Sequence, residues 1–260
     1  MWNNGTIKNI ATPLTAVIGF KEDVMKKMLQ GKRVVVTGAS RGVGLEIASM
    51  FLAHGAGIIG VARNRTNIDR ARKLLAEYGG AITWVAADVA QSNAGGIVAS
   101  AVRRRWGVLD VLINNAAVNP GGESFVDERV DVLERTFQIN VFGMHRMSRA
   151  LLPFLFKGRN PRIINLSSGA GNYHSVDTGI NMPAYRLSKH TVNGLTKLYA
   201  NRLKGKVSVV AMDPGWVRTE MGGPDATDSP ILSAERALEI VLLPQSVTGK
   251  YLVGSQAGGW

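Results

Sequence analysis

The chain of 260 residues contains no cysteine, which excludes disulfides, thiolate metal sites and a cysteine nucleophile. No apolar run approaches the ~20 residues that a membrane-spanning helix needs, so we expect no membrane span. The apolar stretch from Pro13 to Phe20 is short and follows a single charge, Lys8, which argues against a secretory signal. These absences suit a reducing compartment, and we expect the protein to be cytoplasmic.

Acidic residues are scarce: 19 Asp and Glu stand against 31 Lys and Arg, giving a formal net charge of +12. One interpretation is a solvated basic surface on a protein whose ligand is a polyanion. The other is binding to nucleic acid or to an anionic membrane. The only compact basic run, Arg103-Arg104-Arg105, ends a predicted helix, where cations suit the helix dipole, and no zinc finger or aromatic-rich RNA motif accompanies it. We therefore expect no specific nucleic-acid partner.

Short apolar runs alternate with amphipathic stretches of about a dozen residues, a pattern typical of βα units and a parallel sheet. The predicted strands are residues 33–37, 57–62, 81–86, 108–113, 161–166, 207–212 and 251–253. The predicted helices are residues 43–54, 68–78, 94–106, 130–156, a helix carrying Tyr185 to about Leu203, and 234–242. With 45% apolar residues and no long linker, the chain predicts one α/β domain over residues 31–260. Residues 1–30 form an N-terminal extension, in which residues 21–29 suit a short helix.

A glycine-rich turn follows the first predicted strand, from Thr37 to Gly44. Its glycines permit a tight turn and let a pyrophosphate approach the N-terminus of the next helix. The turn is therefore a candidate cofactor site, whose members are Gly38, Ser40, Arg41, Gly42, Val43 and Gly44.

The end of the second strand predicts which nicotinamide cofactor binds. NAD sites usually carry an Asp or Glu there to bond the ribose 2′-hydroxyl, whereas arginine accommodates the 2′-phosphate of NADP. Here the strand ends Ala62-Arg63-Asn64, with no carboxylate, and Arg41 lies on the neighbouring turn. This combination favours NADP.

Tyr185 and Lys189 are four residues apart, so on a helix their side chains share one face. An ammonium beside a phenol favours the phenolate, and we expect it to lower the tyrosine pKa from its ordinary value near ~10. Such a tyrosine can exchange protons near neutral pH. The pair alone also fits a solvated helix face, so its assignment depends on the other motifs.

Six motifs occur in the order seen in single-domain short-chain dehydrogenases/reductases, and residues 32 to 254 resemble that family. They are Thr37-Gly-x-x-x-Gly-x-Gly44, Asn114-Asn115-Ala116-Ala117, Asn140, Ser168, Tyr185-x-x-x-Lys189 and Pro214-Gly215. The resemblance implies a single Rossmann-type doubly wound parallel sheet of about seven strands, flanked by helices.

The resemblance also implies residue roles. The expected catalytic residues are Asn140, Ser168, Tyr185 and Lys189. Ser168 would bond the substrate carbonyl, and Tyr185 would exchange the proton. Lys189 would hold the nicotinamide ribose, and Asn140, at a local helix kink, would organise a water leading to the lysine. Asp88 would bond the adenine ring. Further expected cofactor contacts are Val89, Asn114, Ala116, Pro214, Gly215, Val217 and Thr219.

Two departures from the family pattern concern substrate shape. Alanine at position 117 replaces the usual glycine, which is tolerable unless that position needs a positive φ. The segment from Asn172 to Pro183 is longer than usual and is expected to form an outer wall of the substrate cleft. No His, Asp or Glu cluster has metal-ligand spacing, so we expect no metal.

The resulting expectation is an NADPH-dependent reductase of ketones or aldehydes, reversible as an alcohol dehydrogenase. Alternatives are a 3-oxoacyl carrier-protein reductase, whose acidic partner the basic surface would suit, and a catalytically silent NADP-binding sensor or scaffold. The intact set of four catalytic residues argues against the sensor. The resemblance further implies a homodimer or homotetramer built through the two long helices.

Overall fold

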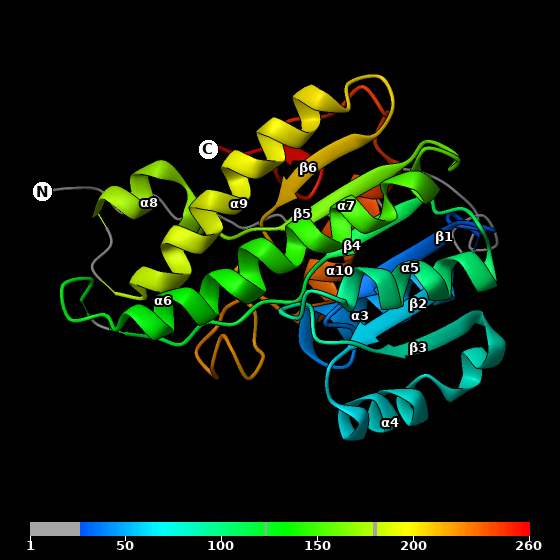
Figure 1. Cartoon of the computed structure of the whole chain (residues 1–260), viewed down its shortest axis with the longest axis horizontal. Helices are drawn as coiled ribbons and strands as arrows, with labels where there is room; N and C mark the ends of the chain where they lie inside the picture. The colour runs from blue at the N-terminus through cyan, green and yellow to red at the C-terminus, as the bar shows by residue number, and fades with distance from the viewer. Residues whose placement is uncertain (1–26, 123, 179–180) are drawn as a thin grey trace, which may run out of the picture.

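The computed structural model describes residues 27–122, 124–178 and 181–260, and these residues form an α/β fold around one sheet (Figure 1). The strand order is β3-β2-β1-β4-β5-β6-β7-β8, and every pairing is parallel except that of β7 with β8. The strands are β1 (Arg33–Thr37), β2 (Gly57–Ala62), β3 (Ile82–Ala86), β4 (Val111–Asn114), β5 (Arg162–Leu166), β6 (Ser208–Met212), β7 (Tyr251–Val253) and β8 (Gln256–Ala257).

Helices cover both faces of the sheet, which confirms the doubly wound arrangement (Figure 1). They are α3 (Gly42–Ala53), α4 (Arg65–Leu74), α5 (Ala94–Arg105), α6 (Val130–Phe137), α7 (Met144–Leu155), α8 (Tyr173–Thr178), α9 (Pro183–Arg202) and α10 (Pro230–Leu242). In β1, Val34 and Val36 pack in the core beneath α3 and α10, whereas Val35 packs beneath α5, α7 and α9. A strand buried on both faces requires the continuous β-branched run seen in the sequence.

The seven predicted strands are all present, while helix α8 was not predicted and other local features refine the prediction. The predicted helix 68–78 begins earlier, at Arg65, and ends at Leu74, where a 3-10 turn, η1 (Ala76–Ala81), follows it and contains Gly79 with a φ of 46°. The short β8 was missed, since two exposed residues give no pattern. The predicted helix 130–156 is interrupted by a π-helical segment, η2 (Gln138–Gly143), which contains Asn140, where the family resemblance implies a local kink. The helix expected over residues 21–29 lies mostly outside the described residues.

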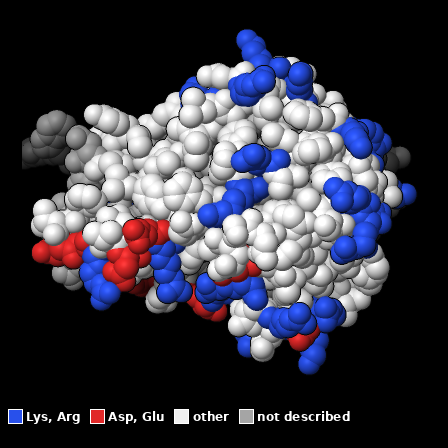
Figure 2. Space-filling model, in the orientation of Figure 1, with Lys and Arg blue, Asp and Glu red and all other residues white. Residues whose placement is uncertain are grey.

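Basic side chains occur at several separate places on the face shown in Figure 2, while Asp and Glu gather mainly over the α6 end. Members of the compact basic run also make internal contacts. Arg105 donates to the Gly80 carbonyl at 2.6 Å and lies 5.1 Å from the Trp106 ring centroid. Arg103 lies 6.0 Å from the Phe154 ring centroid. This distribution suits a solvated basic exterior. No helix of the described ranges is both long and apolar enough to cross a bilayer.

A buried carboxylate joins the amino ends of three strands, at the edge opposite the glycine turn. Asp110 is 0% exposed, and its oxygens accept from Arg33 Nε at 2.8 Å, Arg33 Nη2 at 3.0 Å and the Arg159 backbone N at 2.6 Å. Burial acts to raise the pKa of Asp110, but the hydrogen bonds and the charge of Arg33 outweigh it and hold that pKa below its ordinary value.

We expect Asp110→Asn to lower the free energy of unfolding by about 2 kcal/mol at neutral pH, since bonds to a charged group are lost. Because the folded pKa is depressed, this stabilisation is present above the ordinary pKa of 3.8 and is lost as pH falls through the folded value. Urea denaturation of both chains from neutral to acid pH measures the difference. Asp69→Asn is the matched control, since its ion pair with Arg72 is exposed and should matter little. A constant difference at all pH values would contradict this account.

Candidate active site

A cleft of about 650 Å³ opens at the carboxyl edge of the parallel strands. Its lining comes from the turn after β1, the end of β2, the segments after β3 and β4, the end of β5, helix α9 and the segment after β6. The chain passes from β1 to β2 and β3 on one side, and then crosses back to β4 on the other side of β1. Such a switch point is where open α/β sheets bind ligands.

The glycine turn has a conformation that fits a pyrophosphate. Gly38 and Gly42 have φ values of 67° and 54°, which favour glycine. A Cβ on Gly38 would lie only 2.7 Å from Asn115 Nδ2, whose amide donates to the carbonyls of Thr37 at 2.8 Å and Gly38 at 3.2 Å. No side chain within the described ranges caps the N-terminus of α3, so its first amides are available to an anion at the cleft.

The end of β2 carries no carboxylate into the cleft. Ala62, Arg63 and Asn64 line it, and so does Arg41 from the glycine turn. Asn64 instead caps α4, accepting from the Asn67 backbone N at 3.1 Å. Arg41 forms an ion pair with Glu220, which lies on the segment after β6 and also lines the cleft. The pair therefore spans the cleft between two of its walls.

The structure brings most of the predicted cofactor residues to this cleft. Those that line it are Gly38, Ser40, Arg41, Gly42, Val43, Gly44, Arg63, Asp88, Val89, Ala116, Tyr185, Lys189, Pro214 and Thr219. Two predicted cofactor residues, Gly215 and Val217, belong to the same segment after β6 but do not line the cleft. Asn114 is not among the lining residues of the cleft either, and its side chain donates to Ser148 Oγ at 3.0 Å and Asn165 Oδ1 at 2.8 Å.

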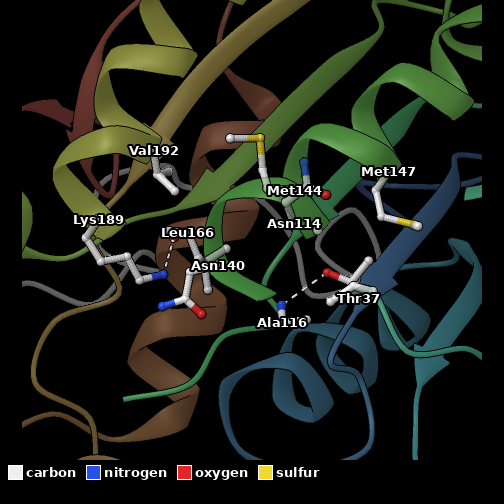
Figure 3. A pocket seen from close by; sticks show the side chains of 11 residues that line it. Thr37, Asn114, Ala116, Asn140, Met144, Met147, Leu166, Lys189 and Val192 are labelled. Carbon is white, nitrogen blue, oxygen red and sulfur yellow. Dashed lines mark hydrogen bonds between the residues drawn. The ribbon is translucent and has the colours of Figure 1, made fainter. Parts of the chain in front are cut away.

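Asn140 lies in the π-helical segment η2, where the sequence resemblance places a helix kink. Its amide is fully engaged: Oδ1 accepts from Val118 N at 2.8 Å, and Nδ2 donates to Val118 O and Ser188 Oγ, both at 2.9 Å. These bonds join η2 to the cleft wall and to α9. Asn140 and Lys189 both line a second cavity of about 10 Å³, shown in Figure 3, which is about the size of one water molecule.

Helix α9 carries Tyr185 and Lys189, and Ser168 follows the end of β5. The Ser168 hydroxyl is hydrogen-bonded to the Tyr185 phenol. Lys189 is 4% exposed, lies 5.5 Å from the Tyr185 ring centroid and donates from Nζ to the Leu166 carbonyl at 2.7 Å. The neighbouring Ser167 is structural, since it donates to Asn193 Oδ1 at 2.6 Å. Thus a phenol and an ammonium line one end of the cleft, and the Ser168 hydroxyl, which is not among the lining residues, lies beside that phenol.

The expected lowering of the tyrosine pKa by Lys189 was wrong for this structure. Burial raises the pKa of Tyr185 to about 12, and the negative charge of Asp213 adds to that rise, while the bond to Ser168 acts in the opposite direction. Burial lowers the pKa of Lys189 to about 8, opposed by Asp213. The physical reason is that burial of the phenol dominates its pKa, while the Lys189 ammonium donates to the Leu166 carbonyl.

Several residues of the site were missed or left without a role from sequence. Asn115 shapes the glycine turn, Val118 and Met221 line the cleft, and Glu220 pairs with Arg41. The signal for Asn115 was present, because it lies beside Asn114 in a recognised motif.

The two departures from the family pattern are accommodated by the fold. Alanine at position 117 needs no positive φ, since the only described non-glycine residues with positive φ are Asn160 and Met182. The long segment after Ser168 contains α8, which Arg186 ties to α9 through the Ser175 carbonyl at 2.9 Å.

The model of the short chain dehydrogenase family matches residues 32–229. The chain is 31% identical to a fatty acyl-CoA reductase of Acinetobacter baylyi over 230 residues, covering 85% of this chain and 75% of the relative. It is 32% identical to the oxidoreductase UcpA of Salmonella typhimurium over 251 residues, covering 88% and 92%. The NADPH-bound carbonyl reductase from chicken fatty liver superposes with a TM-score of 0.82 at 25% identity, covering 89% of this chain and all of that one.

Fold, cleft and sequence thus define a Rossmann-type oxidoreductase. The chain belongs to the short-chain dehydrogenase family.

Proposed function

We propose that this protein is an NADPH-dependent carbonyl reductase that reduces a ketone or aldehyde to the alcohol, reversibly. The observation that carries the proposal is one continuous cleft that runs from Arg41 and Arg63 to Tyr185 and Lys189. A dinucleotide is long enough to reach both ends of this cleft, with its phosphates at one end and its reactive ring at the other. The likeness to an NADPH-bound carbonyl reductase supports the same conclusion.

The residues at the phosphate end suit NADP in particular. The α3 amides fit the pyrophosphate, and Asp88, whose Oδ1 accepts from Ala90 N at 3.0 Å, is held at the wall where the adenine would lie. Arg41 and Arg63 supply positive charge where NAD sites usually place a carboxylate. When bound, the cofactor supplies the hydride that the protein itself cannot.

The residues at the other end hold and move the proton. With a pKa raised to about 12, Tyr185 is a neutral phenol throughout the physiological range and is ready to donate. Ser168 holds the phenol and is placed to bond the same carbonyl oxygen. Lys189 holds the ribose, and the small cavity shared with Asn140 provides room for a water through which the donated proton is replaced.

An NADPH-oxidation screen over ketones, aldehydes, quinones and acyl thioesters tests the proposal. We expect turnover of ketones or aldehydes. Preferred turnover of carrier-bound 3-oxoacyl thioesters would instead support the acyl reductase, which the basic surface and the fatty acyl-CoA reductase relative make the second candidate. NADPH binding without any turnover would support a sensor.

The Arg41–Glu220 ion pair competes with a cofactor phosphate for the same guanidinium. We expect Glu220→Gln to lower the NADPH dissociation constant by about 1.4-fold to fivefold, because an exposed pair is worth roughly 0.2–1 kcal/mol. Fluorescence titration measures it, with NADH in parallel. Asp225→Asn, an exposed carboxylate on the same segment, is the charge-matched control. Weaker NADPH binding, or an equal gain with Asp225→Asn, would show that the ion pair does not compete.

We also propose a homo-oligomer built through the outer faces of α7 and α9. Exposed apolar side chains on these faces include Phe142, at the η2–α7 junction, at 45% and Leu198 at 66%. Sedimentation of the full chain distinguishes a monomer from a dimer or tetramer.

A further inference from the structure

The segment after β6 places a carboxylate beside the proton-handling residues. Asp213 follows β6 directly, and its position is fixed by three bonds. Its backbone N donates to the Leu252 carbonyl at 2.8 Å, Oδ1 accepts from the Gly215 backbone N at 2.9 Å, and Oδ2 accepts from the Tyr251 hydroxyl at 2.7 Å. The carboxylate therefore has a defined orientation between the ends of β5, β6 and β7.

The turn that carries Ser168 lies directly against this carboxylate. A Cβ on Gly169 would lie 3.2 Å from Asp213 Oδ2, so the glycine lets the carboxylate approach the residue next to Ser168. Gly171, at the other end of the same turn, packs against Lys189 of α9, where a side chain would clash with the helix backbone. The turn thus has Asp213 on one side and the helix bearing Tyr185 and Lys189 on the other.

The charged and titratable groups around Asp213 come from three elements. Tyr251 lies on β7, and Tyr185 and Lys189 lie on α9. Arg236 of α10 donates to the Pro214 carbonyl at 2.7 Å, but it is paired with Asp228 at 2.8 Å. That pairing leaves the Asp213 charge to act on the phenols and on the Lys189 ammonium.

We propose that Asp213 is a positioning residue for the carbonyl reduction proposed above, a fixed negative charge that keeps Tyr185 protonated and Lys189 charged. Both effects favour the reducing direction, because reduction needs a neutral phenol and a charged lysine, whereas alcohol oxidation needs a phenolate. The charge of Asp213 acts in this direction on both groups, opposing burial at Lys189 and adding to it at Tyr185. Tyr251 holds the carboxylate in place, and its own phenol pKa is raised by burial and by Asp213.

The test is the pH dependence of kcat/KM in both directions for Asp213→Asn, which removes the charge and little volume. In the reducing direction, we expect the fall of kcat/KM at alkaline pH to occur about one pH unit lower. In the oxidising direction, we expect the rise of kcat/KM with pH to occur about one pH unit lower as well. Asp213→Glu should restore both limbs toward their original positions, because it keeps the charge. Asp225→Asn removes the same charge from an exposed position on the same segment and should leave both limbs in place. Unchanged limbs in an active Asp213→Asn chain, or an equal shift in Asp225→Asn, would overturn the proposal.

A second measurement does not depend on turnover and so separates this proposal from the proposed function. Phenolate absorbance at a fixed alkaline pH, taken as the difference between each chain and its Tyr185→Phe partner in a Tyr251→Phe background, reports ionisation of Tyr185 without the contribution of the neighbouring Tyr251 phenol. We expect more Tyr185 phenolate in Asp213→Asn than in the unmutated chain, with circular dichroism confirming that both are folded. Equal phenolate in the two chains would overturn the role of Asp213 even if carbonyl reduction is confirmed. Failure to find a carbonyl substrate would leave this measurement valid.

Discussion

Tyr185→Phe is expected to lower carbonyl turnover by at least about 100-fold, the magnitude of a lost general acid. The change removes one hydroxyl from a residue that contacts Ser168 and lines the cleft, and it alters little volume. Folding and NADPH binding should therefore survive. Steady-state kinetics at saturating NADPH, together with a thermal melt and a binding titration, measure the three quantities separately.

The matched control is Tyr199→Phe, a phenol on the same helix whose hydroxyl bonds His145 at 2.8 Å, outside the lining of the cleft. It should retain turnover. Lys189→Ala should damage both turnover and NADPH binding, because the ammonium serves both. A Tyr185→Phe chain with most of its activity would rule out the assigned proton donor.

Arg63→Ala is expected to raise the NADPH dissociation constant roughly tenfold to 150-fold, the loss of a charge-assisted contact worth ~1.5–3 kcal/mol. The NADH dissociation constant should change little, because NADH has no 2′-phosphate. The difference between the two cofactors, measured by titration at constant ionic strength, isolates the phosphate contact from a general loss of binding.

Arg65→Ala provides the control, since it removes an exposed arginine on α4 that does not line the cleft. Its loss should leave the ratio of the two dissociation constants unchanged. If the unmutated protein binds NADH and NADPH equally, the preference inferred from the end of β2 is wrong.

The strands could be predicted because their signal is local. A parallel strand buried on both faces needs a continuous apolar run, so β1, β2 and β6 were visible as Val-, Ile- and Ala-rich segments. The π-helical segment was not visible in periodicity, because Gln138 to Gly143 has the residues of an ordinary amphipathic helix. Asn140 forms bonds there to Val118, 22 residues away, and to Ser188, 48 residues away.

Residue types and order determined the family, the glycine turn, the missing acid after β2 and the Tyr185–Lys189 pair, because each is a short pattern along the chain. The directions of the pKa shifts in the site were decided only by the tertiary structure. The shift of the Tyr185 pKa depends on burial, on the Ser168 bond and on Asp213, none of which spacing along one helix can report. Likewise, Asp213 and Tyr251 are 38 residues apart, and only the pairing of β6 with β7 brings them within 2.7 Å. Local sequence fixes which groups are available, whereas the distances between them, on which charge interactions depend, are set by the packing of the sheet and its helices.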